Sequence, residues 1–324
     1  MRCDMMEQSV VLYAEPKLKQ PILIAAWPGM GNVALGAVSY LTAQLQAVEF
    51  AEIKPFGFFE PSGALIKQGL VQMPEFPRSR FYYNRGKGTS PDLILFICET
   101  QPLVRGYEFA NIVMDVAQQF QVTRVYTAAA APTAIHHTHQ PAVWAVASQA
   151  ALMDYLKGFP VVSMTGGRIT GMNGLLLGVA MERDVEATCL LGEIPYYTVS
   201  VPNPKSSMAV LNVLTKLLRV EVSMSELEVM AEQSEQQIEQ LVSSSEEMAK
   251  LAERLKSLQW QPGEAGARPE TEGQIRLRQH IEELFRRAQG DKSKADELKA
   301  ELDRTELFPE YEDRFLDLFK KGDQ

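Results

Sequence analysis

The chain has 324 residues, of which 46% are hydrophobic and 23% are charged, so it can bury a sizeable core and differs from disordered or collagen-like sequences. Its 41 acidic residues outnumber its 32 basic ones, for a formal net charge of -9, which argues against a surface that neutralises the phosphates of a nucleic acid. We therefore expect one large domain with an appendage, or two domains, that binds no nucleic acid.

Strands and helices are expected to alternate in the first half of the chain. Residues 21–26 form a short apolar run that ends at a Pro-Gly turn and leads into a helical pattern over residues 33–45. A second such unit consists of an apolar strand over 93–98 and a helix over 107–120, and another strand is expected at 124–128. Because these runs are apolar at every position, they suit a parallel sheet that helices cover on both faces.

The segments around these units are richer in glycine and proline. Residues 50–83 contain too many Pro and Gly residues for a long helix, so we expect short strands and loops there. A strand candidate follows at 143–147, and then a glycine-rich segment over 166–178, whose end reads as a buried helix. The sequence thus predicts a second turn-to-helix junction.

The C-terminal third has the period of helices. A helical pattern begins at Ser206, and Ser225 and Glu228 form a capping pair for a further helix, which is either one long helix or two antiparallel ones. The predicted organisation is an α/β domain over residues 1–222, a helical extension over 223–260, a Gly/Pro/Glu-rich linker over 261–273 and a helical tail over 274–324.

The cysteines and the apolar segments indicate the compartment. Cys3, Cys98 and Cys189 are too few and too scattered for a disulfide framework, which indicates a reducing environment. The first residues contain no apolar core of a signal peptide, and no later stretch approaches about 18 uninterrupted apolar residues. We expect a cytoplasmic protein that has no membrane segment.

The first glycine-rich turn is a candidate ligand site. Gly29, Met30, Gly31 and Asn32 follow a strand and open a helix, where backbone N–H groups can hold an anion. The segment also fits a weak form of the dinucleotide fingerprint, with Glu49 or Glu52 as a ribose partner. A purely structural role is the favoured interpretation, because any tight strand-to-helix turn uses glycine for its backbone conformation.

A second set of candidates comes from the later glycine-rich segment and one strand end. Gly167, Arg168, Gly171, Asn173 and Gly174 lack the Lys-Ser/Thr ending of a phosphate-binding loop, so close packing is again favoured over an anion site. Glu99 ends an apolar strand, at the sheet edge where α/β proteins place their sites. Its chemical partner is not identified by the sequence.

No metal, cofactor or nucleophile is predicted. His136, His137 and His139 cluster, but they lack a further ligand at useful spacing, so we interpret them as part of a polar surface loop. No Ser, Cys or Thr stands in a recognisable nucleophile motif. The sequence therefore predicts no catalytic residue and no cofactor.

Four blocks together resemble the proteasome assembly chaperone 2 family in its bacterial and archaeal form. They occur in order between about residue 10 and about residue 242: residues 27–34 (WPGMGNVA), residues 99–102 with 107–110 (ETQP, YEFA), residues 137–143 (HTHQPAV), and residues 167–178 with 190–193 (LLGE). The resemblance implies a three-layer α/β fold with a mostly parallel sheet, of a phosphorylase- or hydrolase-like kind, followed here by the α-helical C-terminal extension.

The resemblance also implies a function. It implies a non-enzymatic assembly chaperone or scaffold that binds protein partners and forms a homo-oligomer, for which a trimer fits the family. The last residues, Lys320-Lys321-Gly322-Asp323-Gln324, differ from the hydrophobic-Tyr-X terminus of proteasome-binding chaperones, so the client is left open. The alternative is a small-ligand- or nucleotide-binding enzyme of phosphorylase-like fold that uses the two glycine-rich loops.

Overall fold

The computed structural model describes residues 9–60, 63–244, 250, 280–281, 283–288, 294–305, 311 and 315. The chain divides into two compact units, residues 1–264 and 265–324. The predicted linker, residues 261–273, lies outside the described residues, so the predicted domain boundaries remain predictions.

A nine-stranded sheet forms the centre of the first unit, in the order β1-β3-β6-β7-β2-β8-β11-β9-β10, and β4 and β5 form a separate hairpin. The strands are β1 (Val10–Leu12), β2 (Ile22–Ala26), β3 (Val48–Ile53), β4 (Leu65–Lys67), β5 (Leu70–Gln72), β6 (Ser79–Asn84), β7 (Leu93–Cys98), β8 (Arg124–Thr133), β9 (Val143–Ala147), β10 (Val162–Ser163) and β11 (Glu186–Pro195).

The sheet is parallel at its centre and mixed toward its edges. Strand β2 pairs in parallel with β7 and β8, and β8 pairs in parallel with β11 along the whole length of both. On one side β6, β3 and β1 continue the sheet in antiparallel fashion, and on the other side β9 is antiparallel to β11. The central strands are buried on both faces, which explains why their sequences are apolar at nearly every position.

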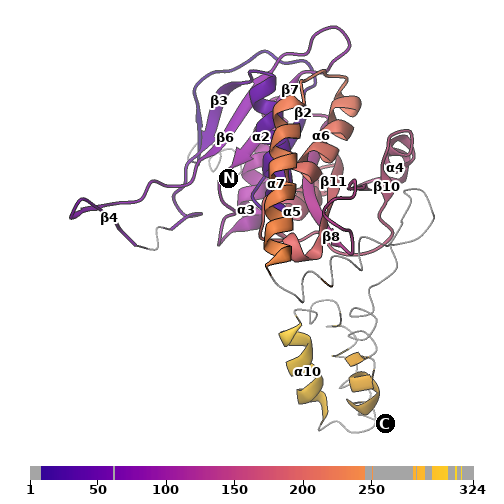
Figure 1. Cartoon of the computed structure of the whole chain (residues 1–324). Coiled ribbons are helices and arrows are strands. Elements are labelled where there is room, and N and C mark those ends of the chain that lie inside the picture. Colours follow the sequence, from indigo (N-terminus) through magenta and orange to yellow (C-terminus); the bar gives the residue numbers. More distant parts are fainter. Residues whose placement is uncertain are drawn as a thin grey trace, which may run out of the picture. The chain divides into compact units, whose positions relative to one another are not determined.

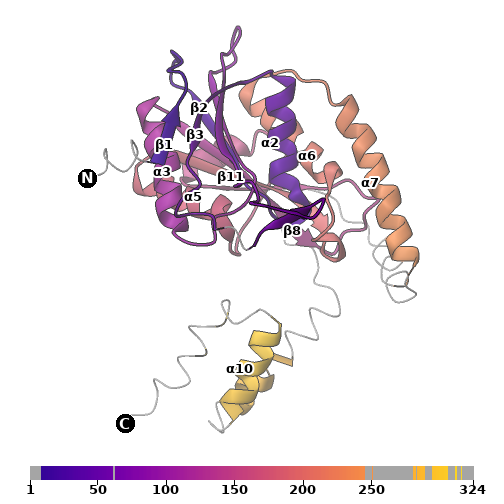
Figure 2. The ribbon, with the colours of Figure 1, turned by 90° about the vertical axis from the view of Figure 1, so that its left-hand side faces the viewer.

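Helices cover both faces of the sheet, as Figures 1 and 2 show. They are α2 (Val33–Gln44), α3 (Gly106–Gln119), α4 (Ala150–Leu156), α5 (Gly171–Glu182), α6 (Pro204–Leu218) and α7 (Ser225–Ser243), with the short 3-10 helices η1 (Met30–Asn32) and η2 (Tyr196–Thr198). None of the helices among the described residues is long and apolar enough to cross a membrane.

The alternation of side chains along β2 shows the three layers. Leu23 and Ala25 belong to the core cluster formed with α3 and α5, whereas Ile24 and Ala26 belong to the cluster formed with α2 and α6. Helix α7 packs on α6 (Figure 2), and its Leu227 side chain belongs to the second cluster. The predicted three-layer α/β class is thereby confirmed.

The second unit has a small core of its own. Helix α10 (Ala295–Arg304) contributes Leu298 and Leu302, whose side chains are buried with Ile281, Leu284 and Phe285. Their spacing of three to four residues places them on one face of each helical segment. The amphipathic pattern of this part of the tail therefore reflects a packed cluster within the unit.

Candidate functional site

The first glycine-rich turn is held by the segment that leads into α6. Gly31 has a φ of +59°, a conformation that suits glycine. Its N–H donates to the Val199 carbonyl at 2.8 Å, and its carbonyl accepts the Asn203 N–H at 2.8 Å. Asn32 is also left-handed, at a φ of +48°, and its N–H donates to Gly29. The Gly31 and Asn32 N–H groups, which could bind an anion, are therefore used within the chain.

Gln101 joins the two glycine-rich segments. Its side-chain NH2 donates to the Pro28 carbonyl at 2.7 Å, and its side-chain oxygen accepts the Met172 N–H at 3.1 Å. A β-carbon on Gly171, the first residue of α5, would lie 2.6 Å from that same oxygen. The structure thus brings the predicted segments together, with the Gln101 side chain between them and bound to the first turn of α5.

The other predicted residues of the second segment differ in their surroundings. Asn173 is buried, and its side-chain oxygen has no hydrogen-bond partner among the described atoms. Gly174 is packed so closely that a β-carbon would lie 2.0 Å from the Ile169 carbonyl oxygen. Gly167 and Arg168 are exposed and lie before the helix.

Glu99 follows β7 at the carboxyl end of the strand, as expected. Its carboxylate accepts the Arg78 N–H at 3.0 Å and lies 3.8 Å from the Arg80 guanidinium. Glu99 therefore binds Arg78, just before the neighbouring strand β6, and Arg80 within that strand. Neither contact involves a glycine-rich turn.

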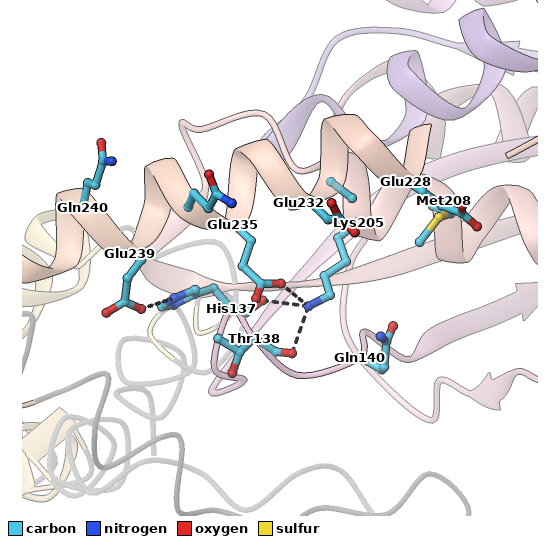
Figure 3. A pocket seen from close by; sticks show the side chains of 12 residues that line it. His137, Thr138, Gln140, Lys205, Met208, Glu228, Glu232, Glu235, Glu239 and Gln240 are labelled. Atoms are coloured by element: carbon cyan, nitrogen blue, oxygen red, sulfur yellow. Dashed lines mark hydrogen bonds and ion pairs between the residues drawn. The ribbon is translucent and has the colours of Figure 1, made fainter. Parts of the chain in front are cut away.

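A pocket of about 910 Å3 lies elsewhere, between α7, the start of α6 and the loop after β8 (Figure 3). Its lining consists of His137, Thr138, Gln140, Lys205, Met208, Glu228, Ala231, Glu232, Glu235, Gln236, Glu239 and Gln240. None of the ten predicted ligand residues lines it. Two ion pairs of α7, Lys205–Glu235 and His137–Glu239, lie in this lining.

Lys205 binds three oxygens at the floor of the pocket. Its ammonium donates to the carbonyls of His137, at 3.2 Å, and Thr138, at 2.9 Å, and to the Glu235 carboxylate. The Lys205 side chain is only 15% exposed, so its charge is compensated by these partners rather than by water. The residue links three elements: α6, the loop and α7.

His137 forms the second link to α7. Its Nε2 lies 2.8 Å from the Glu239 carboxylate, and its Nδ1 lies 2.9 Å from the Tyr197 hydroxyl, which also accepts the His137 backbone N–H. A neutral ring satisfies every partner: Tyr197 donates to Nδ1, and the proton on Nε2 is donated to Glu239. The His137 side chain is 1% exposed.

This burial corrects the interpretation of the histidine cluster. His136 and His137 are buried, and their rings lie 4.1 Å apart, so the expected polar surface loop is wrong for these two residues. Tyr197 and Glu239 supply hydrogen bonds that the sequence did not connect with His137. The part of the chain that the structure describes contains no group of three or more His, Cys, Asp or Glu residues that could hold a metal ion.

The surroundings shift the pKa values of two side chains in this network, Tyr197 and Glu239. Burial raises the pKa of Tyr197 to about 12, so its hydroxyl stays protonated and able to donate. The hydrogen bond from His137 lowers the pKa of the Glu239 carboxyl. The network therefore favours an ionised Glu239 and holds helix α7 to the body.

These charged groups bind one another instead of converging on a reacting atom. The residues that line the pocket include no Cys and no Ser, and its Lys and His are bonded to chain atoms. Sequence reasoning missed Lys205, Tyr197, Glu235 and Glu239. The one available signal was the spacing of Glu235 and Glu239, which places both on one face of a helix.

Comparison with known proteins identifies the family. The PAC2 family profile matches residues 23–242. "Uncharacterized protein MJ1210" of Methanocaldococcus jannaschii is 29% identical over 240 residues, which cover 73% of this chain and 88% of that protein.

Solved structures of Pyrococcus furiosus proteins have the same fold. PbaB, described as an archaeal proteasome activator, is 28% identical with a TM-score of 0.63, and the match covers 72% of this chain and 98% of PbaB. PbaA, described as an archaeal homolog of proteasome-assembly chaperone, is 25% identical with a TM-score of 0.56, and the match covers 76% of this chain and 98% of PbaA. The resemblance found in the four sequence blocks is thus confirmed, and the chain belongs to the PAC2 family.

Proposed function

We propose that this protein is a non-enzymatic assembly chaperone or scaffold, which binds protein partners in the cytoplasm and acts as a homo-oligomer. The observation that carries the proposal is the match of the PAC2 family to nearly the whole α/β body, together with the likeness to PbaB and PbaA. Fold alone does not decide function. The geometry of the candidate sites supplies the second argument for the proposal.

That geometry supports binding to protein over catalysis. In the glycine-rich turns, the Gly31 N–H donates to the Val199 carbonyl and the Met172 N–H donates to the Gln101 side chain, so neither is available to a small anion. In the pocket, Lys205 and His137 bind groups of the chain that hold α7 in place. Neither place combines a free nucleophile with a free base, as nucleophilic catalysis by a side chain would require.

Affinity purification of the tagged protein from its own cell tests the proposal. We expect a defined complex, with a client in fixed stoichiometry, from the full chain. A parallel preparation that lacks residues 262–324 shows whether the tail contributes to client binding. Recovery of a bare oligomer that carries a small metabolite, in both preparations, would contradict the chaperone role and favour a ligand-binding enzyme that uses the glycine-rich loops.

A further inference from the structure

A β-hairpin with an unusually apolar surface extends from the α/β body. Residues 63–73, called the arm below, contain β4 and β5, and every one of them is exposed. Figure 1 shows the hairpin standing away from the sheet and helices. Gln68 and Gly69 both have positive φ, of +54° and +80°, as the tight turn of a two-residue hairpin requires.

The strand register separates the two faces of the arm. Ile66 lies opposite Val71, so these two side chains share one face, while Leu65, Lys67 and Leu70 project to the other. Ile66 is 78% exposed and Val71 is 74% exposed. A two-stranded hairpin is marginally stable alone in water, so an apolar face of this kind is stabilised when another surface covers it.

The base of the arm is anchored in the body. Phe58 and Phe59 are buried, and their rings contact the Phe109 ring of α3 in edge-on fashion at 5.0 Å and 5.9 Å. On the returning strand side, the Phe76 ring packs against Phe56 at 5.2 Å. The arm therefore leaves the body from a fixed base next to the start of α3.

A second exposed apolar surface lies beside that base. Leu103, Val104 and Tyr107, called the socket below, precede and begin α3, and Leu103 is 82% exposed. Arg105, within the socket segment, lies 5.1 Å over the Phe58 ring. The arm thus leaves the body next to the socket, and all three socket residues are exposed, so the arm does not cover its own socket.

We propose that the arm of one copy packs on the socket of a second copy of this chain. This inference rests on the homo-oligomer of the proposed function and names the surface that forms it. An arm that leaves its own socket open and covers that of a partner is the geometry of arm exchange, which forms closed pairs or rings at low cost.

Charge favours this occupant. Lys67 is the one charged residue of the arm, whereas the whole chain has a net charge of -9. A positively charged arm is therefore attracted to the body of a second copy, while two bodies at close range repel one another. The opposite arrangement, in which two arms stack on each other, would place two Lys67 ammonium groups near the same contact.

Area also favours exchange over stacked arms. A stable interface involves about 800 Å2 and about 20–30 residues on each partner. The arm alone has fewer residues than that. When each copy contributes both an arm and a socket to the contact, more residues are covered on each copy than in a contact between two arms.

Paired variants test the proposal. Ile66→Glu with Val71→Lys makes the Ile66–Val71 face of the arm charged and keeps an opposite-charge pair across the hairpin, so the hairpin can still form. Leu103→Ser with Val104→Ser alters the socket. Met230→Ser, on α7 and 50% exposed, is the matched control outside both surfaces. Circular dichroism checks that each variant is folded.

Light scattering and analytical ultracentrifugation then measure self-association over a range of concentrations. We expect the wild type and Met230→Ser to form the same oligomer. For the arm variant and for the socket variant, the dissociation constant of self-association should rise about tenfold or more. An equimolar mixture of the two variants should recover part of the association, because each mixed pair has one intact arm on one intact socket.

Three results would overturn the inference. The first is an arm or socket variant that remains as associated as the wild type, which would leave the homo-oligomer in place but move its surface elsewhere. The second is an arm variant that keeps its oligomer and loses the client, which would make the arm a client-binding surface. The third is a monomeric wild type, which would end both this inference and the homo-oligomer, while client recovery would still test the chaperone role separately.

Discussion

Gly174 and Gly178 are one turn apart in α5 and have very different surroundings. A β-carbon on Gly174 would lie 2.0 Å from the Ile169 carbonyl oxygen, whereas one on Gly178 would have no neighbour within 4 Å. Gly174→Ala should therefore lower the free energy of unfolding by about 1–3 kcal/mol through overpacking. Gly178→Ala should raise it by up to about 1 kcal/mol, because alanine favours the helix.

Chemical denaturation of the two variants checks this prediction. An unchanged midpoint for Gly174→Ala would mean that the Ile169 segment moves without cost, and the packing role of the glycine would be wrong. A parallel screen of inorganic phosphate and nucleotides against Gly174→Ala tests the alternative, in which stability is retained and ligand binding is lost.

Lys205 links α7 to α6 and to the loop after β8. Replacement by Met keeps much of the side-chain volume but leaves the His137 and Thr138 carbonyls and the Glu235 carboxylate without their donor. We expect Lys205→Met to destabilise the protein by about 2 kcal/mol. Lys216→Met, at an exposed position of the same helix, should change stability by less than about 0.5 kcal/mol. Equal midpoints for the two variants in urea would contradict the proposed link.

At the scale of the element, α7 is held in part by the His137–Glu239 hydrogen bond, which should depend on pH. The pKa of Glu239 is lowered from its ordinary value of 4.5, chiefly by the hydrogen bond from His137. Its contribution to stability is therefore fully present above that ordinary value and is lost as the pH falls through the lowered one. Glu239 is 59% exposed, so the effect on the melting temperature should be small.

Melting temperatures of Glu239→Gln and of the wild type, measured from neutral to acidic pH, check this dependence. The difference between them should shrink as the pH falls below the ordinary carboxyl range. Glu232→Gln is the matched control, because Glu232 lines the same pocket and has no ion pair among the described residues. A constant difference at all pH values for Glu239→Gln would exclude the ionic contribution.

Apolar runs and helical periodicity in the sequence were enough to predict several strands and helices. The strands expected at 93–98 and 143–147 are β7 and β9, and the helix expected at 33–45 is α2, which ends one residue earlier. Strand β11 was not predicted as a strand, because Thr188, Gly192 and Glu193 interrupt its apolar run. Its pairing with β8 over ten residues, more than 60 positions earlier, is tertiary information.

The pocket was hidden from the sequence for the same reason. His137 is 60 positions from Tyr197 and 102 positions from Glu239, so no spacing rule connects them. The family resemblance identified the histidine segment as characteristic but gave it no chemical partner. Its burial follows from hydrogen bonds that only the fold brings together.

For the whole molecule, the division into two compact units near residue 264 leads to a prediction about proteolysis. The first unit encloses two large core clusters around one sheet, and the second has its own cluster around Phe285 and Leu298. Between the two cores, residues 261–273 have a Gly, Pro and Glu content that is typical of a linker between domains.

Limited digestion should therefore cut first within residues 261–273 and leave a stable fragment that contains the α/β unit, because proteases cleave where few contacts protect the backbone. Mass spectrometry of the first products locates the cut, and the thermal midpoint of the fragment should match the main transition of the full chain. The exposed arm over residues 63–73 serves as an internal comparison, since its protection should rise with protein concentration if a second copy covers it. Early products that end within the strands or helices of the α/β unit, with residues 261–273 intact, would contradict the division into two independent units.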